Sequence, residues 1–170
     1  MKIEGAKILV TGGAGLIGST TIDQLLANEN PAEIVILDNM SRGTTRNLES
    51  ALKDERVKLI QGDIRDKDLV YKVTEGMDAV IHMAAIRITA CAADPREAME
   101  VMNDGTFNVI DAAHKPGVKK VLAASSASIR SLAIASPAPL SRWLPGNSKS
   151  LYFGSFPSLF ARSEVSGVLK

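Results

Sequence analysis

The chain has 170 residues, of which 45% are apolar, and its formal net charge is +1. Such a length suits one domain with a buried core, and so balanced a charge gives no electrostatic reason to expect nucleic acid or a membrane surface as a partner. The single cysteine, Cys91, excludes an internal disulfide, and together with two isolated histidines it makes no metal site. We see neither a leader pattern nor an apolar run of membrane-spanning length, so a reducing cytoplasm is the expected location.

Apolar runs rich in strand-forming residues alternate with helical patterns up to residue 126. Buried strands are predicted at 6–13, 33–39, 57–62, 78–85 and 119–126, and helices at 16–30, 66–76 and 94–114. Asp66 and Asp94 are the expected N-caps of the second and third helices, and Pro95 is the first helical residue after Asp94. This order predicts an α/β fold, a Rossmann-type doubly wound parallel sheet with helices on both faces.

Several side chains are expected in the interior of this fold. We interpret His82, in an apolar strand, as a hydrogen-bonded core histidine, and His114 as the closing residue of a helix. In the first helix, one face is expected to carry the apolar residues Leu16, Ile17, Ile22, Leu25 and Leu26. In the third helix, the apolar residues interpreted as core are Met99, Met102, Phe107, Val109 and Ile110.

The composition changes near residue 127. Residues 1–126 hold 18 acidic and 15 basic residues, whereas residues 127–170 hold one acidic residue, five basic residues and ten of the fifteen serines. We therefore predict a domain over 1–129 and an atypical, poorly ordered Ser/Pro-rich tail over 130–170, mostly loop with at most one short helix near 158–169. A reading-frame change and a divergent genuine tail both remain open as its origin.

The segment TGGAGLIGS, at 11–19, follows the first strand and opens the first helix. Gly12 would permit a tight turn, Gly15 would let a pyrophosphate approach the backbone, and Gly18 would allow close packing. The helix N-terminus would offer its free N–H groups to the phosphates. The alternative is a glycine-rich turn that binds nothing, but the strand, the helix and a downstream acid together favour a dinucleotide site.

That acid is Asp38, which ends the second strand 20 residues after Gly18. A carboxylate there accepts hydrogen bonds from ribose hydroxyls and repels a 2′-phosphate, which favours NAD over NADP. The neighbouring Arg42 keeps NADP open, and the alternative for Asp38 is an aspartate that caps the turn after the strand. Asp63, with Ile64, would contact adenine or merely cap a helix, and the small Ala84 and Ala85 would leave room for a cofactor or for helix packing.

Taken together, VTGGAGLIGS, ILDNMSRG, GDIRD, VIHMAA, VMNDGTFNVIDAA and KKVLAASSAS resemble the extended short-chain dehydrogenase/reductase superfamily. The resemblance is specifically to the NAD-dependent epimerase/dehydratase family, and UDP-glucose-type 4-epimerases are the most similar members. It covers residues 7 to about 129. It implies a nucleotide-sugar substrate, a possible homodimer, and a C-terminal substrate domain that this chain lacks. The residues it assigns to NAD are Gly12, Gly15, Leu16, Ile17, Gly18, Asp38, Asn39, Asp63, Ile64, Ala84, Ala85 and Asn103.

The resemblance also implies a catalytic serine at Ser126 and a Tyr-x-x-x-Lys pair in which the ammonium lowers the pKa of the phenol. Tyr152 lies 26 residues after Ser126, but position 156 is Phe156. Ala127 and Ser128 stand where the family's dehydratases have Asp-Glu, which argues against dehydration. Three functions therefore remain open: a nucleotide-sugar epimerase-like chain that is inactive by itself, an NAD-binding module without turnover, and a reductase of the same superfamily.

Overall fold

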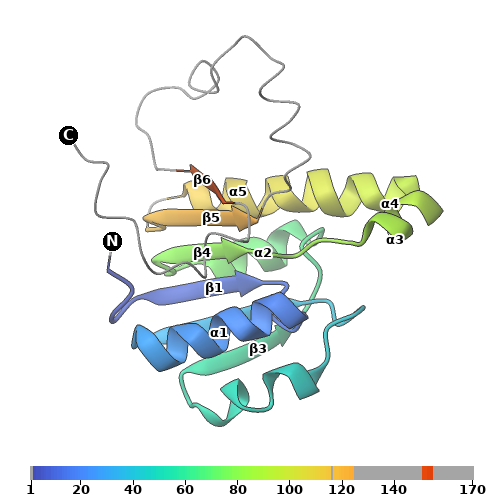
Figure 1. Cartoon of the computed structure of the whole chain (residues 1–170). Helices are drawn as coiled ribbons and strands as arrows, with labels where there is room; N and C mark the ends of the chain where they lie inside the picture. Colours follow the sequence, from blue (N-terminus) through green and yellow to red (C-terminus); the bar gives the residue numbers. More distant parts are fainter. Residues whose placement is uncertain (1, 116, 125–150, 155–170) are drawn as a thin grey trace.

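The computed structural model describes residues 2–115, 117–124 and 151–154, which form a six-stranded parallel sheet with helices on both faces (Figure 1). The strand order is β3-β2-β1-β4-β5-β6, and every neighbouring pair is parallel. This is the strand order of a doubly wound dinucleotide-binding sheet, so the predicted fold class is confirmed. The strands are β1 Lys7–Thr11, β2 Glu33–Asp38, β3 Val57–Gln61, β4 Ala79–His82, β5 Lys120–Ala124 and β6 Leu151–Gly154.

Helix α1 lies on one face of the sheet, and α2 and α5 lie on the other (Figure 1). The α-helices are α1 Leu16–Asn28, α2 Lys67–Thr74, α3 Ile88–Ala93, α4 Pro95–Met99 and α5 Thr106–His114. Short 3₁₀ helices η1 Thr45–Leu48 and η2 Ala51–Lys53 follow β2, and a π-helical segment η3 Glu100–Gly105 joins α4 to α5. The sequence pattern did not predict α3, η1 or η2, because each is too short to show a helical period.

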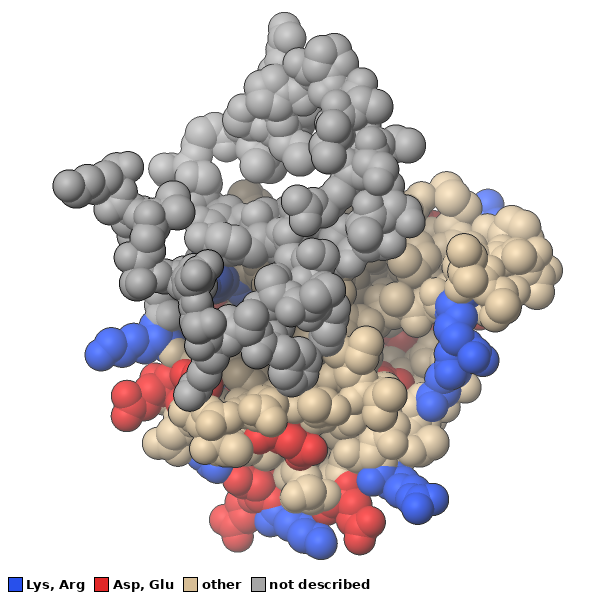
Figure 2. Space-filling model, in the orientation of Figure 1, with Lys and Arg blue, Asp and Glu red and all other residues tan. Residues whose placement is uncertain are grey.

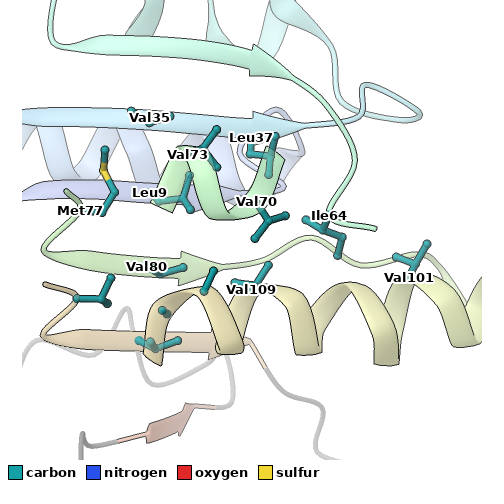
Figure 3. Packing of buried hydrophobic residues seen from close by; sticks show 14 residues of the cluster. Leu9, Val35, Leu37, Ile64, Val70, Val73, Met77, Val80, Val101 and Val109 are labelled. Atoms are coloured by element: carbon teal, nitrogen blue, oxygen red, sulfur yellow. The ribbon is translucent and has the colours of Figure 1, made fainter. Parts of the chain in front are cut away.

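The core has two layers because successive strand residues point to opposite faces of the sheet. Leu9, Val35 and Val80 pack with α2 and α5 on one face (Figure 3). Ile8, Ile34 and their neighbours pack on the other face with α1, η1 and η2. Burial on both sides explains why these strands read as continuous apolar runs in the sequence.

Two predicted N-caps are confirmed. The side chain of Asp66 accepts a 3.0 Å hydrogen bond from the N–H of Leu69. The side chain of Asp94 accepts bonds from the N–H groups of Arg96 and Glu97, both at 3.0 Å. These bonds satisfy N–H groups that the first turn of a helix leaves without a partner.

The prediction that Met99, Met102 and Phe107 belong to the core is wrong. Their exposed fractions are 56%, 41% and 64%, whereas Val109 on the same helical run is fully buried. A helix on the surface of a sheet buries one stripe only, and the π-helical turns of η3 change the spacing of that stripe. A pattern counted at 3.6 residues per turn therefore assigns too many residues to the core.

The expectation of a loop at residues 151–154 is also wrong, because these residues form β6, which pairs in parallel with β5. Leu151, Tyr152 and Phe153 are residue types that strands favour, but the composition of the surrounding tail obscured this signal. The helix expected near 158–169 lies outside the described residues.

On the face of the molecule shown in Figure 2, acidic and basic side chains are interspersed. Within the described ranges, no helix has both the length and the apolar character that crossing a bilayer would require.

Candidate functional site

A pocket of about 650 Å³ opens where the carboxyl ends of β1 and β4 lie side by side. The chain leaves β1 toward α1 on one face of the sheet, and it reaches β5 from β4 through α5 on the opposite face (Figure 1). The two connections therefore diverge and leave a crevice, which is the position where open α/β sheets bind their ligands.

The glycine segment forms the floor of this pocket. Gly12 has φ 72°, a conformation that glycine adopts without strain. A Cβ on Gly12 would lie 2.6 Å from the backbone nitrogen of Ala84, so the backbone just after β4 also requires a glycine here. A Cβ on Gly18 would meet the carbonyl oxygen of Gly12 and lie 2.7 Å from the Cα of Gly13. The close packing predicted for Gly18 is therefore against the glycine turn itself.

Gly15 has a different environment. It is the N-cap residue of α1, and the nearest atom to a Cβ placed there would be the carbonyl oxygen of Gly12 at 3.3 Å. The start of α1 has neither a side-chain cap nor an acidic residue in its first turn. Its first backbone N–H groups, those of Leu16, Ile17 and Gly18, thus lie beside the pocket, an arrangement that suits an anionic group.

Leu16 and Ile17 belong to the pocket wall and not to the buried face of α1. They are 77% and 48% exposed, whereas Ile22 is fully buried and Leu25 nearly so. Both residues precede the point at which α1 packs on the sheet.

Asp38 fastens two loops to each other at the edge of the pocket. Its Oδ2 accepts a 2.9 Å bond from the N–H of Ala14, and its Oδ1 accepts a 2.9 Å bond from the N–H of Met40. A carboxylate offers about four lone-pair sites, so each oxygen keeps one site for a further donor. Asp38 can therefore hold the loops and also bind hydroxyl groups.

Two residues of this rim escaped the sequence reasoning. The Asn47 side chain donates a 2.8 Å bond to the carbonyl oxygen of Ala14. Gly43 packs so closely that a Cβ would lie 2.5 Å from Cβ of Ala14 and 2.9 Å from Oδ1 of Asp38. A glycine five residues after the acidic residue was the only signal in the sequence for this contact.

The opposite end of the pocket is built around Asp63, which begins the turn between β3 and α2. Oδ1 accepts bonds from the backbone N–H and Nε of Arg65, and Oδ2 accepts bonds from Nη2 of Arg65 and Nδ2 of Asn39, all at 2.9–3.0 Å. The Arg65 side chain is the main cause that lowers the pKa of Asp63 to about 2. The carboxyl group is therefore ionised at neutral pH.

Ile64 is 5% exposed and lines the pocket beside Asp63. Nδ2 of Asn108 on α5 donates to the carbonyl oxygens of Ile64 and Arg65 at 3.1 and 3.3 Å. A Cβ on Gly105 would lie 2.6 Å from Cγ1 of Ile64, so the helix approaches this turn closely. Neither Asn108 nor Arg65 carried a signal at the level of sequence motifs.

His82 is the hydrogen-bonded core histidine that the sequence predicted. It is 5% exposed, and its ring nitrogens lie 2.6 Å from Oγ1 of Thr11 and 3.1 Å from Oγ1 of Thr106. His114 is the last residue of α5, as predicted.

The structure brings eleven of the twelve residues assigned to the cofactor around one pocket. One group comes from the glycine loop and α1: Gly12, Gly15, Leu16, Ile17 and Gly18. The other comes from the ends of β2, β3 and β4 and the turns that follow: Asp38, Asn39, Asp63, Ile64, Ala84 and Ala85.

Asn103 is the exception. Its side chain is exposed and lies 3.3 Å from the sulfur of Met99, away from the pocket lining. Of the two catalytic candidates, Ser126 lies outside the described residues. Tyr152 is in β6, paired with Leu122, and the position of its side chain also lies outside the description.

Residues 9–163 match the model of the 3-beta hydroxysteroid dehydrogenase/isomerase family. The chain belongs to this family. Over 121 residues it is 36% identical to a putative UDP-glucose 4-epimerase of Methanocaldococcus jannaschii, an alignment that covers 70% of this chain and 37% of the relative. The predicted resemblance to NAD-dependent epimerases and dehydratases is thus confirmed.

Solved structures give the same relationship. The UDP-glucose 4-epimerase of Thermus thermophilus in complex with NAD is similar with a TM-score of 0.62 and 32% identity, over 71% of this chain and 37% of that one. DesIV, the dTDP-glucose 4,6-dehydratase of Streptomyces venezuelae with NAD and TYD bound, is similar with a TM-score of 0.65 and 35% identity. That match covers 69% of this chain and 38% of DesIV. The chain therefore spans well under half the length of these relatives.

Proposed function

We propose that this chain binds NAD in the pocket at the ends of β1 and β4. The observation that carries the proposal is the start of α1, where uncapped N–H groups and the open side of Gly15 face the pocket. This arrangement fits a pyrophosphate, which needs backbone donors and a glycine without a Cβ at the point of contact. The two similar structures described above, both of which contain NAD, support the assignment.

In this proposal the adenosine half of NAD extends from the glycine loop toward β2 and β3. Asp38 has a free acceptor site on each carboxylate oxygen for the two ribose hydroxyls, and its negative charge disfavours a 2′-phosphate. Asn39 lies beside it, and Asp63 and Ile64 form the end of the pocket where the base would lie. Ala84 and Ala85 leave room for the cofactor beside β4.

We infer that the chain is the cofactor-binding part of a nucleotide-sugar epimerase-like enzyme. Bound NAD supplies the acceptor and donor of hydride in such chemistry. In this assignment Ser126 orients a sugar hydroxyl. Tyr152 is the candidate base that would take the proton from that hydroxyl. In this assignment residues 1–129 supply the binding pocket. Residues 130–170 differ from them in composition, although β6 at 151–154 adds a strand to the same sheet.

For the 170-residue polypeptide tested by itself, we propose cofactor binding without epimerisation. Neither Tyr71 nor Tyr152 is followed by lysine at the fourth position, where Glu75 and Phe156 stand. An unassisted phenol has a pKa of about 10 and is a poor base at neutral pH. Positioned acid–base catalysis contributes roughly 10²- to 10⁴-fold in rate.

A second candidate is a dehydrogenase that makes a net hydride transfer to or from NAD. The match to the 3-beta hydroxysteroid dehydrogenase/isomerase family favours it, because the dehydrogenase reaction in that name ends with an oxidised or reduced product. It uses the same pocket and the same cofactor, and only the substrate and the fate of the hydride differ.

Isothermal titration of the purified chain with NAD tests the shared part of these proposals. Saturable binding at one site per chain, weakened at least tenfold in Gly15→Val, supports them. Absence of NAD binding by the folded wild-type chain would remove the proposal. An assay for interconversion of UDP-glucose and UDP-galactose on the same sample tests the inactivity, which measurable turnover would contradict.

A further inference from the structure

Strand β3 has the same arrangement of one aspartate and one arginine at each of its two ends. At the start, Oδ1 of Asp54 accepts bonds from the backbone N–H and Nε of Arg56 at 3.0 and 2.9 Å, and Oδ2 accepts from Nη2 at 2.6 Å. At the end, Asp63 and Arg65 form the same three bonds at 2.9, 3.0 and 2.9 Å. We call each of these an Asp-x-Arg clamp.

The two clamps differ in what else they touch. In the first, Nη1 of Arg56 donates to Oδ1 of Asn30 and to the carbonyl oxygen of Pro31, so the clamp fixes the turn between α1 and β2. That end of the strand lies away from the pocket, and neither member of the clamp lines it. The first clamp is a purely structural device.

In the second clamp the aspartate faces the pocket and the arginine lies behind it. Asp63 lines the pocket and Arg65 does not. Nη1 of Arg65 lies 3.4 Å from Oε2 of Glu100 in η3, and Glu100 is held in turn by Nε of Arg96 at 2.8 Å. Arg65 therefore connects the Asp63 carboxylate, which lines the pocket, to η3.

Of the four hydrogen bonds that Asp63 accepts, one comes from a donor that a ligand could replace. Three of its four donors belong to Arg65, only two residues away, and they hold the carboxylate in a fixed plane. The fourth is the exposed side-chain amide of Asn39, from a different loop, at 3.0 Å. Since a carboxylate has about four lone-pair sites, a ligand that donates to Asp63 takes the site that Asn39 occupies.

We propose that Arg65 is a positioning residue for base recognition: it holds Asp63 so that one lone pair of Oδ2, the one to which Asn39 donates, accepts the exocyclic amino group of adenine when NAD binds. This inference rests on the proposed binding of NAD. Arg65 itself does not touch the base. Its planar fork fixes the orientation of the carboxylate in a way that the point charge of lysine does not.

The test compares NAD with nicotinamide hypoxanthine dinucleotide, in which a carbonyl oxygen replaces the amino group of adenine. Isothermal titration gives the ratio of the two dissociation constants. In the wild-type chain the ratio should favour NAD by at least about tenfold, because Asp63 accepts from the amino group but repels the carbonyl oxygen. In Arg65→Gln the ratio should fall to about threefold or less, and Arg65→Lys should not restore it.

Arg56→Gln is the matched control, since it breaks the same clamp at the other end of β3. It should lower the thermal stability of the chain but leave the ratio of dissociation constants at the wild-type value. A purely structural role for Arg65 would instead weaken both dinucleotides equally, and an unchanged ratio in folded Arg65→Gln overturns the proposal.

The proposal and the underlying function fail in different ways. If the wild-type chain binds neither dinucleotide, the assignment of NAD fails. If it binds both with equal affinity, NAD binding stands and the role of Asp63 and Arg65 is excluded. Asn39→Ala tests whether the adenine amino group replaces the Asn39 amide at Oδ2 of Asp63. The ratio of dissociation constants should keep or increase its preference for NAD, because the competing amide is gone.

Discussion

Nδ1 of His82 lies 2.6 Å from Oγ1 of Thr11, and the opposite ring nitrogen lies 3.1 Å from Oγ1 of Thr106. The imidazole thereby connects β1, β4 and the start of α5. Oγ1 of Thr11 lies 3.4 Å from the N–H of Ala84, the residue against which Gly12 packs. The support of the glycine turn thus includes a buried histidine that is hydrogen-bonded at both ring nitrogens.

Burial lowers the pKa of His82 to about 4, so the folded chain should lose stability as the pH falls from about 6.5 to about 4. In this window the unfolded chain binds a proton at His82 and the folded chain does not. A displacement from 6.5 to about 4 corresponds to about 3 kcal/mol in the free energy of unfolding. Urea denaturation at several pH values measures it.

His82→Gln should remove most of this pH dependence above pH 4, and His114→Gln, which removes the other histidine, should retain it. The carboxyl groups of Asp54 and Asp63 have pKa values of about 2, so their own loss of stability comes only below about pH 4. An unchanged slope between pH 4 and 6.5 in His82→Gln would assign it to other groups.

Gly15→Val should weaken the binding of NAD and leave the chain folded, whereas Gly18→Ala should lower the stability of the fold. The space beside Gly15 is open apart from one oxygen at 3.3 Å, so valine should leave the chain folded and fill the place of the pyrophosphate. At Gly18 even one methyl group meets the backbone of Gly12 and Gly13, and the strain should lower stability by about 1–3 kcal/mol. Thermal denaturation and titration with NAD separate the two effects.

In this pair each variant is the control of the other. Gly15→Val with a wild-type melting temperature and lost affinity places the ligand over the glycine turn. If Gly15→Val binds NAD as the wild type does, the turn is only structural. If Gly18→Ala melts at the wild-type temperature, the close approach to Gly12 is not a constraint on the fold.

The sequence predicted the parts of the fold that depend on a regular period or on a backbone requirement. Strands such as Ile34–Leu37 are buried on both faces and read as continuous apolar runs, and Gly12 adopts the positive φ that its place in the turn demands. The pocket was predictable for the same reason, because parallel strands bring their carboxyl ends to one edge.

Contacts between distant segments were not predictable in this way. The helical pattern over 94–114 was correct as a helix, but the π-helical turns of η3 and the exposure of Phe107 depend on how that helix rests on the sheet. The bonds of Arg65 to Glu100 and of Asn108 to Ile64 join side chains to partners that no motif specifies. β6 was missed because its four residues stand in a segment whose composition is typical of loops.

Asp38 and Arg42 should set the choice between NAD and NADP in opposite directions. Both line the pocket, and Asp38 is a buried residue whose carboxylate is held by the N–H groups of Ala14 and Met40. Like charges at close range disfavour binding, so Asp38 should hold back a 2′-phosphate while Arg42 attracts it. The wild-type chain should bind NAD more tightly than NADP.

In Asp38→Asn the preference for NAD should fall by on the order of tenfold, which corresponds to about 1.4 kcal/mol. In Arg42→Ala it should rise, because the pocket loses the cation that would attract a 2′-phosphate. Asp23→Asn removes the same charge from the exposed side of α1 and should leave the preference unchanged. Isothermal titration of both dinucleotides against each folded variant measures the ratio. Equal or tighter binding of NADP by the wild type would contradict the role given to Asp38. If the preference for NAD falls equally in Asp23→Asn, the net charge of the chain and not the position of Asp38 would explain it.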